Sequence, residues 1–406
     1  SAEREGLRPK GNVPNLRFPE FQGEWEELGL SELLDFKNGL NPKPDKFGKG
    51  IKFISVMDIL NNAVITYDCI KASVDVTEKE LSDFSVEKGD LLFQRSSETL
   101  EDVGRANVYM DDKTAVFGGF VIRGKKKGEY DPQYFNYLLR SPFARKRIIP
   151  MGAGAQHFNI GQEGLSKVKL HFANIEEQKK IGKMLSLLDE RIATQNKIIE
   201  DLKKLKSAII DYAINSLNTD FAKFGSLYEM AGEGGTPTTS NASFYDNGKI
   251  PFIKIDDLKQ KYLTENKDFI TELGLQKSSA WLVPTHSILF SNGATIGEIS
   301  ITTYPVCTKQ GILGIVPKQN IDVEFLYYFM SSSYFKKAVS RIVTEGTMKT
   351  AYLKDINNIL CPIPTKEKQQ EIAKMPSALN SKIDFEQSIL KLFCSQKQYL
   401  LRQMFI

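Results

Sequence analysis

The chain has 406 residues, of which 41% are hydrophobic and 26% charged, and its formal net charge is +4. This length accommodates two to three globular domains, and no apolar run approaches the ~18 residues that a membrane span requires. The polar start lacks the apolar core of a signal peptide. Four scattered cysteines without CxxC spacing favour buried thiols over disulfides or a zinc site. We therefore expect a cytoplasmic protein without a metal centre.

The sequence contains a long internal repeat. Asp189-Glu190-Arg191-Ile192 corresponds to Asn380-Ser381-Lys382-Ile383, an offset of 191 positions (380 − 189). The offset holds without a gap from Asp131 and Asp322 onward, and further upstream the register drifts by a few residues. A period of this length indicates two copies of a whole domain plus its connector, not a solenoid of small repeats. We expect a pseudo-two-fold architecture.

Residues 1–170 are predicted to form the first globular domain. Short apolar segments bounded by turn residues predict strands at 51–56, 89–93, 106–109 and 116–122. Aromatic and aliphatic residues near helical spacing then predict one helix over 132–149.

A different pattern follows at 171–217. Asn174 with Glu177 is a capping-box signature, and it predicts a helix over 175–217, roughly 60 Å long. Apolar residues step by alternating four and three positions, as in a heptad seam. The seam residues are Ile181, Leu185, Leu188, Ile192, Gln195, Ile199 and Leu202.

Residues 218–364 are predicted to form a second globular domain with the same pattern as residues 1–170. Strands are predicted at 250–255, 287–290, 298–301 and 311–316, followed by a helix over 323–343. Residues 365–406 repeat the long helix. Pro376 takes the seam position of Leu185 and predicts a kink or a late helix start. The second seam comprises Ile372, Leu379, Ile383, Glu386, Leu390 and Phe393.

Neither long helix is expected to stand alone in water, so the two are predicted to pack on each other. The first helix leads away from the first domain and the second must return, which makes the pair antiparallel. The predicted fold class is therefore mixed α+β: two similar α/β domains joined by two long antiparallel helices.

Catalytic motifs are largely absent. No G-x-G-x-x-G follows a strand. Residues 119–125 match the phosphate-binding pattern G-x-x-x-x-G-K, but Lys126 stands where the Ser/Thr that would hold magnesium is required. No Asn/Asp-Pro-Pro-aromatic loop for methyl transfer to a base is present. We expect no catalysis and no cofactor in this chain. Two alternatives remain open: a free-standing nuclease or methyltransferase, and a coiled-coil scaffold with two protein-binding heads.

Basic side chains cluster at corresponding places in both copies, which favours a shared role facing phosphates. One cluster contains Arg140, Arg145, Lys146 and Arg147, and its counterpart contains Lys336, Lys337 and Arg341. A further basic group comprises Arg123, Lys125, Lys126 and Lys127.

Three segments carry a family resemblance: residues 14–21 followed by Trp25, residues 154–160, and residues 176–189 with their repeat at 367–379. Together they resemble the specificity subunits of type I restriction-modification systems. The resemblance implies that each globular domain reads one half of a split DNA target. It also implies that the helix pair sets the gap and docks two methylation subunits, which restriction and translocase subunits join. S-adenosylmethionine, ATP and Mg would then belong to those partner subunits.

Candidate DNA-binding residues fall into four sets. Two sets are drawn from the segments after the strands at 91–93 and 288–290 and from the loops near 154 and 347. The third set follows Gly39 and Gly235, two glycines that match between the copies, and the fourth is the shared basic cluster. In that order they are Gln94, Arg95, Ser96, Ser97, Thr99, Arg105, Ser291, Asn292 and Thr295; Gly154, Gln156, Asn159, Thr347 and Lys349; Lys43, Lys46, Lys49, Thr236, Thr238 and Thr239; and Arg145, Lys146, Lys336 and Lys337. Arg and Gln can make bidentate contacts to guanine and adenine in the major groove, whereas lysines more often position the duplex.

Overall fold

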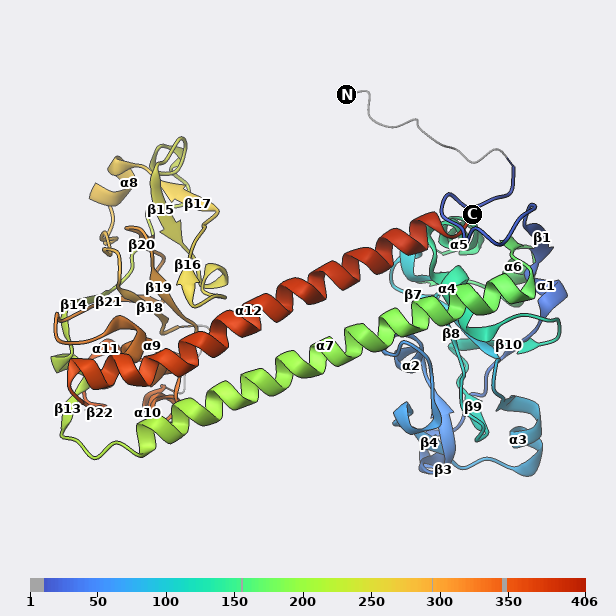
Figure 1. Cartoon of the computed structure of the whole chain (residues 1–406), viewed down its shortest axis with the longest axis horizontal. Helices are drawn as coiled ribbons and strands as arrows, with labels where there is room; N and C mark the ends of the chain where they lie inside the picture. Colours follow the sequence, from blue (N-terminus) through green and yellow to red (C-terminus); the bar gives the residue numbers. More distant parts are fainter. Residues whose placement is uncertain (1–10, 155, 294, 345–348) are drawn as a thin grey trace. The chain divides into compact units, whose positions relative to one another are not determined.

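The computed structural model describes residues 11–154, 156–293, 295–344 and 349–406, which form two compact units (Figure 1). Unit 1 comprises residues up to Asn196 together with Ser388–Ile406, and unit 2 comprises Lys197–Gln387. Two long helices, α7 (Ile175–Asn215) and α12 (Lys366–Gln403), each contribute one segment to each unit. Each unit therefore contains one globular part and a segment of both helices.

The globular part of unit 1 is built on two four-stranded sheets. The first is antiparallel, in the order β2 (Leu34–Asn38), β10 (Val121–Lys126), β6 (Leu91–Gln94), β8 (Ala106–Val108). The second has the order β4 (Ser73–Val74), β3 (Phe47–Ile54), β9 (Ala115–Phe117), β5 (Ser85–Val86), and β3 and β9 run parallel.

The single strand predicted over 116–122 is wrong, because the segment forms the end of β9 and the start of β10, which lie in different sheets. The Gly118-Gly119 pair makes the turn between them, closed by a 2.8 Å hydrogen bond from Val121 N to Gly118 O. The apolar residues continue across this turn, so the sequence pattern shows no boundary.

The remaining elements of unit 1 are short. The two-stranded pairings are β1 with β12 and β7 with β11. The bounds are β1 (Glu26–Gly29), α1 (Leu30–Leu33), α2 (Val56–Asn61), α3 (Glu78–Phe84), β7 (Ser96–Ser97), β11 (Phe158–Asn159), α6 (Gln162–Ser166) and β12 (Lys169–Phe172).

Unit 2 repeats this plan. Its main sheet has the order β14 (Tyr228–Glu233), β21 (Ile312–Pro317), β18 (Ile288–Ser291), β19 (Ile299–Thr302), β16 (Tyr262–Leu263). A second sheet has the order β17 (Asp268–Ile270), β15 (Ile250–Ile253), β20 (Cys307–Thr308), with β15 and β20 parallel as β3 and β9 are. Strands β13 (Phe221–Lys223) and β22 (Leu360–Pro362) pair like β1 and β12, and α8 (Glu272–Gln276) and α11 (Leu353–Ile356) complete the unit.

The predictions of one helix over 132–149 and one over 323–343 are both wrong, because each region forms two helices. Unit 1 contains α4 (Pro132–Arg140) and α5 (Pro142–Ile148), separated by Ser141 in an extended conformation. The hydroxyl of Ser141 accepts a bond from Ala144 N, and Pro142 disfavours helical geometry at the residue before it. In unit 2, Ser332 caps the second helix in the same way, between α9 (Val323–Ser331) and α10 (Ser333–Ile342).

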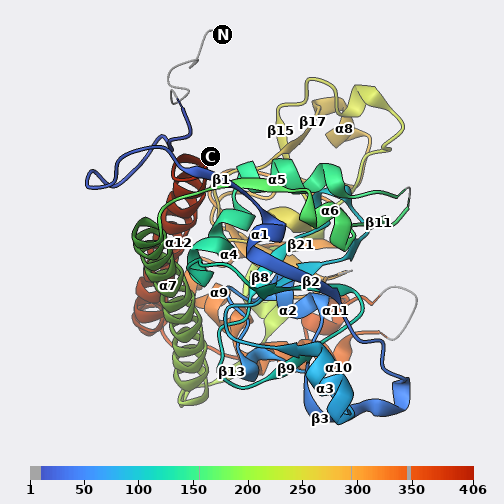
Figure 2. The same cartoon turned by 90° about the vertical axis from the view of Figure 1, so that its right-hand side faces the viewer.

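Within unit 1 the two long-helix segments lie antiparallel. Lys397 Nζ is 2.5 Å from Asp189 Oδ1, and Arg191 lies over the ring of Phe393 at 5.3 Å. The numbering therefore rises along α7 as it falls along α12. Ile181 and Leu185 join the end of α12 in one core cluster with the globular part, and Figure 2 shows the two helices side by side.

Unit 2 shows the same relation, with Lys206 Nζ donating to Asn380 Oδ1 at 2.9 Å, and Ile210 and Ile214 sharing a core cluster with Ala373. The predicted helix over 175–217 ends two residues earlier, at Asn215. Of the two alternatives predicted for Pro376, the late helix start is wrong, because α12 begins at Lys366 and contains the buried Pro376. The kink stays a prediction.

The predicted seam positions are all buried or half-buried, and Gln195 and Glu386 are each only 7% exposed. Among the residues that the structure describes, no helix is long and apolar enough to cross a bilayer.

Candidate nucleic-acid interface

In unit 1 the structure brings the first two candidate sets together. Strand β7 pairs with β11, so that Ser96 faces Asn159 and Ser97 faces Phe158. The hydroxyl of Ser96 donates to Asn159 Oδ1, and Ile160 N donates to Arg95 O at 2.9 Å. Segments more than 60 positions apart therefore form one surface (Ser96 to Asn159, |i−j| = 63).

The loop of the second set is held by its own backbone. Ala153 and Asn159 exchange two backbone hydrogen bonds of 2.9 and 2.8 Å. Gly154 has φ +143°, and a Cβ there would lie 2.0 Å from His157 O, so the turn requires glycine. Gln156 is exposed beyond this closure, which leaves its amide accessible to a ligand.

Arg95 and Gln94 differ sharply in accessibility. Arg95 is half-buried, and its Nη1 donates to Gly119 O at 3.3 Å. Gln94 is 5% exposed, its Nε2 donates to Ser96 O at 2.9 Å, and its Oε1 is buried without a partner among the described residues. Gln94 therefore lies beneath the surface as the last residue of β6, in a position that supports the segment after it.

Arg145 is directed toward the protein interior, while its neighbour Lys146 is exposed. Arg145 Nη2 donates to Glu101 O at 2.8 Å and to Val103 O at 2.6 Å. Burial, with the nearby charge of Arg105, lowers the pKa of Arg145 to about 10, so it stays charged at neutral pH. Arg145 thus anchors the segment that follows Thr99. Thr99 and Arg105 are exposed, and Arg105 forms a 2.6 Å ion pair with Asp102.

Unit 2 forms the same junction with different side chains. Ala351 N donates to Asn292 O at 2.8 Å, as Ile160 N does to Arg95 O, and Gly293 bridges to Thr350. Asn292 stands where Arg95 stands, but it is 1% exposed and its Nδ2 donates to Ala351 O at 3.3 Å. Ser291 is also buried, with its hydroxyl donating to Thr295 O, whereas Thr295 is exposed.

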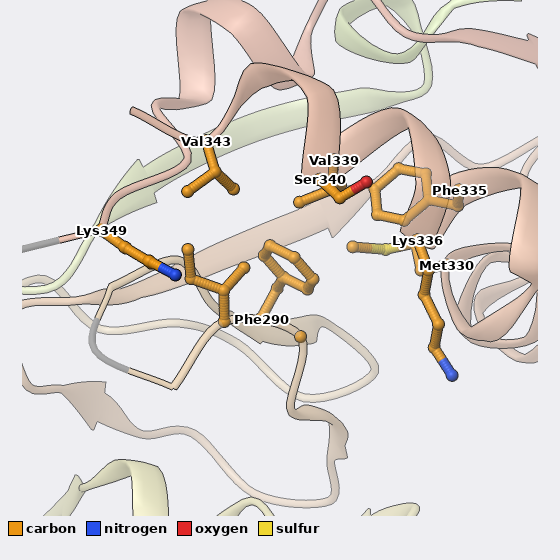
Figure 3. Close-up of a pocket in the computed structure, with 10 residues that line it drawn as sticks. Phe290, Met330, Phe335, Lys336, Val339, Ser340, Val343 and Lys349 are labelled. Atoms are coloured by element: carbon orange, nitrogen blue, oxygen red, sulfur yellow. The ribbon is translucent and has the colours of Figure 1, made fainter. Parts of the chain in front are cut away.

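A hollow of about 480 Å³ lies beside this junction. Figure 3 shows its floor of apolar side chains, including Phe290, Phe335 and Val339, with Lys336 and Lys349 at opposite ends. Two candidate sets therefore meet at one hollow of unit 2. Thr347, which belongs to the same predicted loop, lies outside the described residues.

The third candidate set lies on exposed segments. Lys43, Lys46 and Lys49 are exposed, and the amino groups of Lys46 and Lys49 lie 3.4 and 3.5 Å from Asp75. The hydrogen bond and charge of Lys46 lower the pKa of Asp75. In unit 2, Thr238 and Thr239 are exposed, while Thr236 Oγ1 accepts a bond from Gln310 N at 3.3 Å.

Much of the predicted basic surface is used within the protein. Arg123 is 7% exposed and donates to Ser85 O, and Arg147 pairs with Glu27 at 3.0 Å. Lys125 and Lys127 lie 3.5 and 3.7 Å from the carboxylates of Glu87 and Asp35. By contrast, the exposed Lys146, Lys336 and Lys337 form no ion pair with the described residues.

Sequence reasoning missed a buried lysine that precedes β16 in the main sheet of unit 2 and links this sheet to α12. Lys261 is 5% exposed, and its Nζ is 2.9 Å from Glu324 Oε2 and 3.0 Å from Ser377 Oγ. The ring of Tyr328 lies 4.8 Å from the same nitrogen. Glu324 corresponds to Gln133 in the first copy. Nothing in the sequence distinguishes Lys261 from the many surface lysines. Among the described residues, no cluster of His, Cys, Asp or Glu could hold a metal ion.

Comparison with known proteins gives one consistent result. A family model described as the type I restriction modification DNA specificity domain matches twice, over residues 22–204 and 218–392. A specificity subunit assigned to the type I restriction enzyme MjaX of Methanocaldococcus jannaschii is 25% identical, over 92% of this chain and 91% of the relative.

Two solved structures have a similar fold. The S subunit of a type I restriction-modification system from M. genitalium has a TM-score of 0.57 at 18% identity, covering 97% of this chain and 99% of that chain. A chain from a structural account of the assembly and conformational transition of the type I restriction-modification system has a TM-score of 0.59 at 14% identity, with 93% and 96% covered. The expectation of two similar mixed α/β domains with two long helices is confirmed.

Proposed function

The chain belongs to the family of the type I restriction modification DNA specificity domain, and from this premise we propose that it is the non-catalytic DNA-specificity subunit of a type I restriction-modification complex. Each unit reads one half of a bipartite target in the major groove. The long helices fix the gap between the halves and dock two methylation subunits, through which restriction and translocase subunits join. S-adenosylmethionine, ATP and Mg belong to those partners.

One observation carries the proposal: both units join the same two segments into one surface, with the same backbone bond at Arg95 and at Asn292. A repeated scaffold that presents different side chains suits a reader of two unequal half-sites. Unit 1 offers Arg95 and Gln156 at this surface, whereas unit 2 offers Thr295 and Lys349. Non-identical readers predict an asymmetric target, since half-site symmetry follows protein symmetry.

Lysines at the repeated positions supply the sequence-independent part of the affinity. Lys146 and Lys337 are 191 positions apart (337 − 146), both are exposed, and both lie on the helix that follows a serine cap. Cationic side chains that contact phosphates position a duplex without reading its bases.

The long helices also expose apolar side chains, which fits the docking of partner subunits. Leu187 and Leu205 on α7 are each 48% exposed, and Phe385 and Leu392 on α12 are 59% and 69% exposed. None of these residues belongs to the core clusters of either unit.

The proposal is tested by measuring DNA affinity of the assembled complex over a series of salt concentrations. Each phosphate contact contributes about 0.9 to the slope of log affinity against log salt. The double substitution Lys146→Ala with Lys337→Ala is expected to lower that slope by about 2 and to weaken binding to every duplex alike. Lys183→Ala with Lys374→Ala is the matched control, since these exposed lysines share the same offset but lie on the long helices.

An unchanged slope in the first variant would remove these two lysines from the DNA interface. Absence of any salt-dependent binding to duplex DNA by the assembled complex would contradict the proposed function itself.

A further inference from the structure

Unit 2 contains an open groove at the junction of its two helix segments. The groove has a volume of about 620 Å³ and lies between the last turns of α7, the connector at 216–219 and the first turns of α12. Two apolar side chains in it are strongly exposed: Tyr212 at 77% and Met375 at 58%. Exposure of this kind at a concave surface marks a place where another chain can bind.

The internal repeat identifies the corresponding surface of unit 1 and shows which segment covers it. Adding the offset of 191, Met184 corresponds to Met375, and Tyr212 corresponds to Gln403. In unit 1 this surface is covered by the chain segment at 11–25. Leu16 N donates to Gln403 O at 2.9 Å, and Met184 is half-buried against the core.

Two charged contacts fix that segment in unit 1. Arg17 binds the fully buried Glu177 with two hydrogen bonds of 2.8 Å. Three positions later, Glu20 pairs with Lys180, whose amino group also lies 4.4 Å from the ring centre of Phe18. The segment is therefore bound by one acidic and one basic residue on the first turns of α7.

Connector length explains why the groove of unit 2 stays open. Strand β13 corresponds to β1, and both pair with the strand that precedes a long helix. The long segment 11–25 precedes β1, whereas only residues 216–220 join α7 to β13. Five residues suffice to make the connection but not to cross the first turns of α12 as the longer segment crosses α7.

The charges of the groove are the reverse of those in unit 1. Lys368 stands at the position of Glu177, and Glu371 stands at the position of Lys180. They are 50% and 65% exposed at their side chains and pair with each other at 2.9 Å. A second copy of segment 11–25 would place Arg17 against Lys368 and Glu20 against Glu371, and such like-charge contacts disfavour it.

We propose that this groove is a docking site for an extended segment of a partner protein, with an acidic side chain facing Lys368 and, three positions later, a basic side chain facing Glu371. An apolar side chain of that segment covers Met375 and Tyr212. The site shares no residue with the proposed DNA-reading surface, so the proposed reading of DNA does not depend on it.

The test uses the full chain and two fluorescent peptides that span residues 11–23. One peptide has the native sequence, and the other carries Arg17→Glu and Glu20→Lys. We expect the charge-reversed peptide to bind at least about ten-fold more tightly, a difference of about 1.4 kcal/mol. In a protein with Lys368→Glu and Glu371→Lys the preference should invert. Tyr212→Ala should weaken binding of the reversed peptide about ten-fold, whereas Leu392→Ala on the exposed face of α12 should not change it.

Three results would overturn the proposal: equal affinity for both peptides, preference for the native peptide, or a preference that survives the charge exchange in the protein. Preference for the native peptide would point to a second copy of this chain as the occupant. All substituted residues are exposed, so folding is retained, which is checked by thermal unfolding. DNA affinity measured on the same proteins should stay constant, which separates failure of this site from failure of the proposed function.

Discussion

The two units have the same arrangement of residues where their long-helix segments meet, but the side-chain contacts that hold these segments together differ in charge. In unit 1 the long-helix segments are joined by an ion pair between Lys397 and Asp189. In unit 2 the equivalent Lys206 donates to the neutral amide of Asn380. Both lysines and both acceptors are 191 positions apart, so the geometry is repeated while the charge is not.

Contacts to the backbone show the opposite behaviour, because they are the same in both units. Gln178 Oε1 accepts Asp131 N at 3.0 Å, and Gln369 Oε1 accepts Asp322 N at 2.7 Å. Asp131 and Asp322 in turn cap α4 and α9. A side chain that satisfies buried backbone groups has few substitutes, whereas a side-chain pair can change as long as both partners remain satisfied.

The largest expected effect comes from a core position where the units differ. Phe335 is fully buried against the rings of Phe224, Phe290 and Phe329, while the equivalent residue of unit 1 is Ala144. Phe335→Ala should lower the free energy of unfolding of unit 2 by about 3–5 kcal/mol, since a cavity remains. Denaturant unfolding of the full chain measures it. Phe385→Ala, at a position 59% exposed, is the control and should change stability by less than about 0.5 kcal/mol.

A second experiment tests the shared helix junction. Gln178→Met and Gln369→Met should each cost about 1–3 kcal/mol, because each removes partners from buried backbone groups. Gln178 Nε2 also donates to Ala173 O, and Gln369 Nε2 donates to Pro364 O. Unfolding measurements should give similar losses in the two units. A large loss in only one of them would show that the junction is not a common requirement of the repeat.

Arg95 and Asn292 occupy equivalent positions at the proposed DNA surface, but we expect Arg95 to contact bases and Asn292 to stabilise the fold. Arg95→Ala should reduce discrimination at one base pair of the first half-site by about 1–3 kcal/mol and leave the gap unchanged. Asn292 is buried, so Asn292→Ala should instead lower the stability of unit 2. Selection of bound duplexes from a random pool, with unfolding measured in parallel, separates the two effects. An altered gap in the Arg95 variant would contradict its assignment to one half-site.

The smallest expected effect concerns the neutral partner of Lys206. Burial lowers the pKa of Lys206 below its ordinary 10.5, so the unfolded chain binds more protons and stability rises as pH approaches that value. Asn380→Asp places a carboxylate against Lys206 as Asp189 is placed against Lys397, so it should raise the pKa of Lys206 and flatten this rise. It also removes the amide that donates to Asp384 Oδ2 at 3.1 Å, and repulsion between the two carboxylates should hold the net change in stability at neutral pH within about 0.5 kcal/mol. Urea unfolding of both proteins across this pH range measures the difference. An equally steep rise in the variant would show that Lys206 is not its source.

Much of the fold could be predicted because its signals extend over many residues. The offset of 191 and the two seams predicted the long helices to within two residues at the end of α7. The break at Ser141 could also have been predicted, since Pro142 disfavours a helical residue before it. Ser332 has no such proline after it, and only its hydroxyl cap marks the boundary.

The candidate site was less predictable because its contacts are short and distant in sequence. Strands β7 and β11 contain two residues each, too few for a periodic signal. Arg145 and Lys146 are adjacent cations, and only the three-dimensional fold separates the one that holds Glu101 and Val103 from the one that faces solvent. Charge clusters alone therefore overestimated the exposed basic surface.

The central claim is that two similar units read two different half-sites. It is tested most directly by expressing the chain with its cognate methylation subunit and mapping methylated bases across the host genome. The account predicts an asymmetric motif in two short blocks separated by a fixed number of unspecified base pairs. A continuous motif, or a palindromic one, would contradict it.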